Sequence, residues 1–193
     1  MNRLIRFTLS LFAFWLLIFF VNRLFFVLYQ LPIGQKIKDN KDLYRAFVKG
    51  YTIDFSTSAI LLLLPLLLAI LYYLLRKENI KRYKARLVLV LLVLYTAVAL
   101  SDAGLYREWN AKINMQALEH FQNPSEVFKT LSLKFVALYL ALLSGFSFFF
   151  FWLYKKWVHP QLYYDVEERS GKRILPALAY FLLSGGLAII VIR

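Results

Sequence analysis

The stretch FVALYLALLSGFSFFFFWLY (135–154) holds twenty consecutive residues without a charge, between Lys134 and Lys155. At about 1.5 Å per residue, a helix of this length crosses the ~30 Å hydrocarbon core of a bilayer. A chain in lipid must satisfy its own backbone polar groups, and uniform apolarity is unlike the alternating pattern of a transmembrane β-strand. The stretch therefore predicts a membrane-spanning helix.

Four more stretches have the same character. The predicted spans cover about 5–28, 52–75, 87–106, 135–154 and 174–192. The composition agrees, with 61% hydrophobic and 18% aromatic residues. The first apolar run continues without a small-residue cleavage site, which predicts an uncleaved anchor rather than a signal peptide. We expect an all-α, polytopic integral membrane protein in which residues 1–193 form a single transmembrane domain.

The formal net charge is +13, and the basic residues bracket the apolar runs. That pattern favours anionic phospholipid headgroups as partners and disfavours nucleic acid. The N-terminal tip and the predicted loops 76–86 and 155–173 together carry 13 Lys and Arg, and the other face carries 10. The densest loop has six basic residues in eleven. The bias predicts a cytoplasmic N-terminus and, after five spans, an extracytoplasmic C-terminus.

Two short amphipathic helices are expected at the outer interface. In the first, Asn40 caps the helix and Gly50 ends it. One i, i+4 row of this helix contains Lys41, Arg45 and Lys49. That row is either a solvated face or a contact for anionic headgroups.

The second amphipathic helix precedes the fourth span. Asn123 fits its N-cap, Pro124 its first turn and Glu126 its third position. A helix that starts there would run into the fourth span.

Charged and aromatic side chains gather at the predicted outer rim. They are Arg23, Asp54, Asp102, Tyr106, Arg107, Glu108 and Trp109. Arg23 either extends to the headgroups or has a functional contact, and Asp54 is interpreted chiefly as a cap for the second span. Asp102 either pairs with Arg23 or Arg107, or contacts a lipid headgroup or substrate. Tyr106 and Trp109 fit an interfacial aromatic belt.

Catalytic and metal-binding motifs are not evident. The chain has no cysteine, and its two histidines, His120 and His159, fall on opposite sides of the membrane in this topology. No catalytic residue and no metal ligand is therefore assigned. An intramembrane enzyme with Asp54 and Asp102 as paired carboxylates is a rival hypothesis that the position of both residues near the rim disfavours.

The segment DAGLYREWNAKINMQALEHFQNPSEVFKTLS (102–132) carries a family resemblance. It resembles the outer loop between the third and fourth spans of lipoteichoic acid synthase-like, sulfatase-fold phosphoglycerol transferases of the Bacteroidetes type. The stretch GYTIDFSTSAILLLLPLLL (50–68) is similar to the second span of that family. YREW (106–109) is the most specific part of the resemblance.

The resemblance implies five spans followed by a large extracytoplasmic catalytic domain. That domain would use a metal ion, typically manganese, and a threonine nucleophile to transfer phosphoglycerol from phosphatidylglycerol to an acceptor. Residues 1–193 stop where the catalytic domain would begin, so no cofactor is expected in this chain and it should not be catalytic alone. Its partners would be membrane lipids and a missing or separate catalytic domain.

The expected function is the membrane anchor of a phosphoglycerol or phosphoethanolamine-type transferase in the bacterial cytoplasmic membrane. The alternative is a stand-alone small polytopic protein, such as an assembly factor or a transporter subunit. The centres of the predicted spans are uncharged and no inverted repeat is evident, which disfavours transport.

Overall fold

The computed structural model describes residues 2–30, 40–75, 78–109 and 132–162, and the regular structure among them is entirely helical. Its elements are α1 (Asn2–Gln30), α2 (Asn40–Leu75), α3 (Glu78–Trp109), α6 (Leu133–Leu153), a π-helical turn η2 (Tyr154–Val158) and a 3-10 turn η3 (His159–Leu162). Four helices are long and apolar enough to cross a membrane. Four of the five predicted spans are therefore confirmed as apolar helices, and 174–192 lies outside the described residues.

The helices α2 and α3 extend further than the sequence suggests. The expected end of a separate outer helix at Gly50 is wrong, because α2 continues unbroken from Asn40 to Leu75. The loop predicted at 76–86 is also largely wrong, because α3 begins at Glu78. A glycine lowers helix stability by only about 1 kcal/mol relative to alanine, so contacts with neighbouring helices outweigh it.

The start of α6 differs from the second predicted amphipathic helix. The proposed caps at 123–126 lie outside the described residues. In the structure the N-cap of α6 is Ser132, whose hydroxyl accepts a hydrogen bond from the Phe135 N–H at 3.3 Å. This bond satisfies one of the backbone donors that a helix start leaves open.

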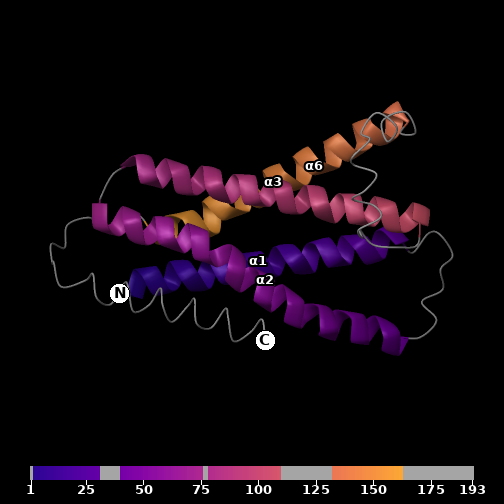
Figure 1. Cartoon of the computed structure of the whole chain (residues 1–193), viewed down its shortest axis with the longest axis horizontal. Helices are drawn as coiled ribbons and strands as arrows, with labels where there is room; N and C mark the ends of the chain where they lie inside the picture. Colours follow the sequence, from indigo (N-terminus) through magenta and orange to yellow (C-terminus); the bar gives the residue numbers. More distant parts are fainter. Residues whose placement is uncertain (1, 31–39, 76–77, 110–131, 163–193) are drawn as a thin grey trace.

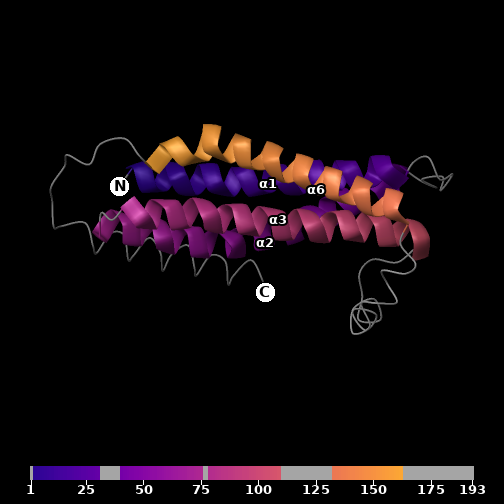
Figure 2. The ribbon, with the colours of Figure 1, turned by 90° about the horizontal axis from the view of Figure 1, so that it is seen from above.

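The four long helices alternate in direction (Figure 1, Figure 2). As a result, α1 and α3 begin at the end where α2 and α6 finish. We name this the basic end, because among the described residues it carries eight cations and one acid: Arg3, Arg6, Lys81, Arg82, Lys84, Arg86, Lys155 and Lys156, with Glu78. The opposite, mixed end carries six cations and four acids: Arg23, Lys41, Arg45, Lys49, Arg107 and Lys134, with Asp42, Asp54, Asp102 and Glu108.

Helices α1 and α3 form the central pair of the bundle. At the mixed end the Gln30 side-chain amide donates to the Ala103 carbonyl at 3.0 Å. At the basic end the ammonium of Lys84 lies 4.4 Å from the centre of the Phe7 ring, and the Lys84 side chain is fully buried. The sequence had put Lys84 in a loop; its place inside the helix pair is a correction. The two contacts set α1 and α3 parallel and in register.

Helix α6 crosses this pair obliquely (Figure 2). Near its start, Phe135 lies against Gly104 of α3, and the Tyr139 hydroxyl donates to the Ala97 carbonyl at 3.0 Å. Past its end, the ring of Tyr154 packs at 5.8 Å from Phe14 of α1. The helix thus moves from α3 at the mixed end to α1 at the basic end, and most of its first half faces outward.

We expect Tyr139→Phe to lower the stability of the bundle by about 1 kcal/mol. The substitution removes the bond to Ala97 and the 3.1 Å contact with the Ser101 hydroxyl, and such bonds in membranes average about 0.6 kcal/mol. Denaturant titration in detergent micelles measures the change. Tyr51→Phe is the matched control, because Tyr51 is 51% exposed. Equal effects of the two substitutions would contradict a stabilising contribution of the α3–α6 hydrogen bonds.

Candidate functional site

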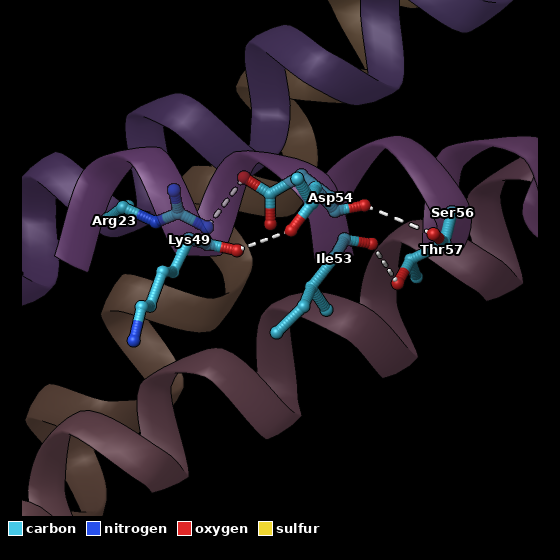
Figure 3. Close-up of polar contacts among 7 residues, drawn as sticks. Arg23, Lys49, Ile53, Asp54, Ser56 and Thr57 are labelled. Carbon is cyan, nitrogen blue, oxygen red and sulfur yellow. Dashed lines mark hydrogen bonds and ion pairs between the residues drawn. The ribbon is translucent and has the colours of Figure 1, made fainter. Parts of the chain in front are cut away.

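An ion pair joins α1 to α2 inside the apolar segments. The Arg23 guanidinium Nη2 lies 2.6 Å from the Asp54 Oδ2 (Figure 3), with the side chains only 21% and 14% exposed. Arg23 is seven residues before the end of α1, which is about 10 Å along the helix axis. A carboxylate at this depth requires a cationic or hydrogen-bonding partner, and Arg23 provides it.

Gly50 makes room for this pair. Gly50 and Asp54 are four residues apart on α2 and so lie on the same face of the helix. The guanidinium of Arg23 rests against Gly50 so closely that a Cβ at that position would overlap it. The glycine that the sequence suggested as a helix end is therefore the residue against which the Arg23 guanidinium packs.

Helix α3 closes a third side of the site. The ring of Tyr95 packs at 4.7 Å from Phe19 of α1, and its hydroxyl lies within electrostatic reach of both Arg23 and Asp54. Asn22, which is 5% exposed, lies near the Tyr95 hydroxyl, but its side-chain amide does not meet the geometry of a standard hydrogen bond. The ion pair therefore lies where α1, α2 and α3 meet.

The half of α2 at the mixed end has hydroxyl side chains that bond to their own helix (Figure 3). The Thr52 hydroxyl donates to the Lys49 carbonyl at 2.7 Å, and the Ser56 hydroxyl donates to the Thr52 carbonyl at 3.1 Å. The Thr57 hydroxyl donates to the Ile53 carbonyl at 2.8 Å. Such bonds satisfy the hydroxyl donors within the helix, so this half of α2 can face lipid. The residues of α2 that are buried lie deeper, from Ser58 to Ile70.

The structure changes the interpretation of two predicted residues. Asp54 does not cap a helix, because it lies in the interior of α2, fourteen residues after Asn40. Arg23 has an intramolecular partner instead of only extending toward headgroups. The sequence put both residues at one depth, and the structure brings them together.

The other predicted rim residues lie at the same end of the bundle. The Tyr106 ring contacts Phe26 edge-on at 5.2 Å, and Asp102 is partly buried on α3. Its expected pairing with Arg23 or Arg107 stays a prediction. The final residues of α3, Arg107, Glu108 and Trp109, are helical, and their side chains lie outside the described part.

The residues of the predicted basic row all lie in the uninterrupted helix α2. Lys41, Arg45 and Lys49 lie in one helix at i, i+4 spacing, so they share a face. The Lys49 side chain is exposed, and those of Lys41 and Arg45 lie outside the described part of the chain.

Sequence reasoning missed Gly50, Asn22 and Tyr95 as parts of the site. A glycine one turn before an intramembrane acid is the signal that could have found the first.

The geometry suits charge recognition near the membrane surface. In the described ranges, no group of three or more His, Asp or Glu side chains lies close enough to hold a metal ion. The residues that do converge are one cation, one anion, an amide and a phenol, which are groups capable of charge interactions and hydrogen bonds.

No family model, no curated protein and no solved structure matches this chain. The resemblance to phosphoglycerol transferases stays a prediction.

We expect Gly50→Leu to separate α1 and α2 at the mixed end and to destabilise the bundle by about 2 kcal/mol. A side chain at residue 50 displaces the guanidinium from Asp54, and overpacking of this kind typically costs 1–3 kcal/mol. Unfolding in micelles provides the measurement, with Gly145→Leu as control, since a Cβ at Gly145 meets nothing within 4 Å. The Arg23→Met background should reduce the Gly50→Leu effect. If Gly50→Leu lowers the unfolding free energy equally with Arg23 and with Met at residue 23, the packing of Arg23 against Gly50 is not the cause of the effect.

Proposed function

We propose that this chain is the membrane-anchor domain of a sulfatase-family phosphoglycerol or phosphoethanolamine transferase. Its role is to hold an extracytoplasmic catalytic domain at the outer leaflet. The observation that carries the proposal is the position of 102–109, which includes YREW (106–109), the most specific part of the family resemblance. These residues form the last turns of α3 and lie at the mixed end, with the Arg23–Asp54 pair.

The proposal orients the basic end toward the bacterial cytoplasm. Eight described Lys and Arg lie at that end against six at the other, which supports this orientation under the positive-inside rule. Residues 174–192 form a fifth span in the proposal, and the chain leaves the membrane outside at Arg193. In the family, that is the side on which the catalytic domain works.

The mixed end also takes part in positioning a phospholipid. Lys49 is exposed and is the chain neighbour of Gly50, against which the Arg23 guanidinium packs. Lys41 and Arg45 continue that row toward the start of α2. A row of cations attracts anionic headgroups at about 1 kcal/mol per residue near the surface. The proposed ligand is phosphatidylglycerol, with its phosphodiester at these cations and its glycerol hydroxyls at Asp102 and Tyr106.

Cysteine labelling tests the orientation. The chain has no native cysteine, so each introduced thiol is unique. Asn79→Cys lies near the start of α3 and Ser132→Cys near the start of α6, and both positions are exposed. A membrane-impermeant maleimide should label residue 132 in intact cells and residue 79 only after permeabilisation. The reverse pattern would overturn the orientation.

Lipid turnover tests the function. Transfer of phosphoglycerol from phosphatidylglycerol leaves diacylglycerol, so radiolabelled phosphatidylglycerol reports the reaction in cells. Deletion of the gene should lower diacylglycerol formation at least several-fold, and the restored gene should recover it. Unchanged turnover in the deletion strain, together with the expected cysteine labelling, would leave the stand-alone polytopic protein as the better hypothesis.

A further inference from the structure

The end of α6 has an unusual local structure at the basic end. The helix continues beyond Leu153 as the π-helical turn η2, which closes with a bond from the His159 N–H to the Tyr154 carbonyl. Tyr154 and Val158 are both fully buried, and α1 contacts this turn. Between them, Lys155, Lys156 and Trp157 are exposed in succession. The turn thus anchors its two ends on the bundle and presents two adjacent cations to the surroundings.

Both cations lie on aromatic rings. The Lys155 ammonium is 4.9 Å from the centre of the Phe151 ring, and the Lys156 ammonium is 5.0 Å from that of Trp152. Each ring is four residues earlier in α6, so each ammonium points from its own Cα toward the mixed end. The cations are therefore held on the membrane side of the turn rather than extended into water.

In their described residues, the elements that form the turn and the helix α1 beside it contain no acidic side chain. Residues 132–162, which include α6, η2 and η3, contain no Asp or Glu, and neither does α1 (Asn2–Gln30), which contacts the turn. Two adjacent cations near hydrocarbon need a nearby anion, since an isolated charge is costly there. Among the described residues of these elements, no acidic side chain balances the two lysines, so an anion from another molecule is a suitable counter-charge.

The aromatic residues indicate what kind of molecule fits. Trp152 is 49% exposed and Trp157 is 40% exposed, on either side of the lysine pair. Exposed tryptophans next to lysines are typical of the boundary between acyl chains and headgroups. A phospholipid combines the two required features, because its phosphate is anionic and its acyl chains contact the rings.

We propose that Lys155, Lys156, Trp152 and Trp157 form a binding site for an anionic phospholipid in the leaflet at the basic end. The phosphate lies between the two ammonium groups, and the acyl chains lie along α6 against the tryptophans. This site is at the opposite end of the bundle from the Arg23–Asp54 pair, and it does not depend on the proposed function.

Tryptophan quenching by brominated lipids tests the proposal. The protein carries Trp109→Phe, which removes the tryptophan at the mixed end, and Trp15 is fully buried, so Trp152 and Trp157 report on lipid. It is reconstituted into phosphatidylcholine vesicles with a minor fraction of either brominated phosphatidylglycerol or brominated phosphatidylcholine. Stronger quenching by the anionic lipid is expected, because it concentrates at the site.

Substitutions of the lysines give the decisive comparison. Each basic residue near a membrane surface contributes about a fivefold preference for anionic lipid. Lys155→Gln with Lys156→Gln should therefore lower the relative affinity for phosphatidylglycerol roughly 25-fold. The double arginine variant should keep the preference. Lys134→Gln, an exposed lysine at the other end of α6, is the matched control and should change nothing.

Two results would overturn the site. One is equal quenching of the Trp109→Phe protein, with its native lysines, by the two brominated lipids at low salt, which would mean that the lysines are neutralised from within the chain. The other is a preference that survives the double glutamine substitution. If that variant does not fold, two measurements still test the site. They are the comparison of the two brominated lipids with the native lysines, and the single glutamine substitutions at residues 155 and 156.

Discussion

Arg23→Met is expected to lower the free energy of unfolding by about 3 kcal/mol. The substitution leaves the Asp54 carboxylate, which is 14% exposed, without the guanidinium 2.6 Å away. Removing one member of a buried ion pair typically costs 3–5 kcal/mol, and partial exposure puts this pair at the lower end. Denaturant titration in detergent micelles, followed by circular dichroism, provides the measurement.

A double substitution separates pairing from packing. Replacing both charges with apolar side chains of similar size is often neutral or stabilising in a buried setting. Arg23→Met combined with Asp54→Leu should therefore lie within about 1 kcal/mol of the wild type. Lys49→Met removes an exposed cation from the same end and should have little effect. If the double variant is as unstable as Arg23→Met alone, the unpaired carboxylate is not the cause.

Trp15→Ala is the second large effect that we expect, at about 3 kcal/mol. Trp15 is fully buried, and its ring centre lies 6.0 Å from Phe14, 6.2 Å from Phe19 and 6.4 Å from Tyr95. Lipid tails are as apolar as the core, so helix association in membranes depends on packing rather than on transfer out of water. Truncation removes that packing and leaves a cavity between α1 and α3, and Trp→Ala in cores costs about 3–5 kcal/mol.

An exposed aromatic residue provides the control for Trp15→Ala. Phe148 on α6 is 75% exposed, so lipid replaces its side chain when it is truncated. Phe148→Ala should change the unfolding free energy by less than about 1 kcal/mol. A Trp15→Ala effect no larger than that of Phe148→Ala would show that α1 and α3 are not held together by this contact.

The four predicted spans that are confirmed as long apolar helices show what an apolar run determines. In lipid, the backbone N–H and C=O groups of the stretch 135–154 can form hydrogen bonds only within the chain, and a helix provides all of them. Length and apolarity therefore suffice to predict α6. The errors are at helix ends. Gly50 and the 76–86 segment resemble boundaries in sequence, but α2 runs through Gly50 and α3 already begins at Glu78, since neighbouring helices stabilise turns that propensity alone would weaken.

The candidate site was predictable in depth but not in detail. Counting residues from the ends of the spans puts Arg23 and Asp54 at one level. Asp54 was misread as a cap because the sequence does not show that residues 40–53 are already helical. Tyr95 joins the site from α3, more than forty residues from Asp54, and no local pattern signals such a contact.

The sequence by itself determined four apolar helices long enough to span a membrane and the uneven charge of the two ends. Those properties depend on how many apolar residues follow one another and on which charges flank them. Only the tertiary structure decided that Arg23 pairs with Asp54 over Gly50, that Lys84 is buried on Phe7, and that α6 crosses from α3 to α1. The physical reason is that helix rotation and crossing follow from the packing of side chains against neighbouring helices, which apolarity alone does not specify.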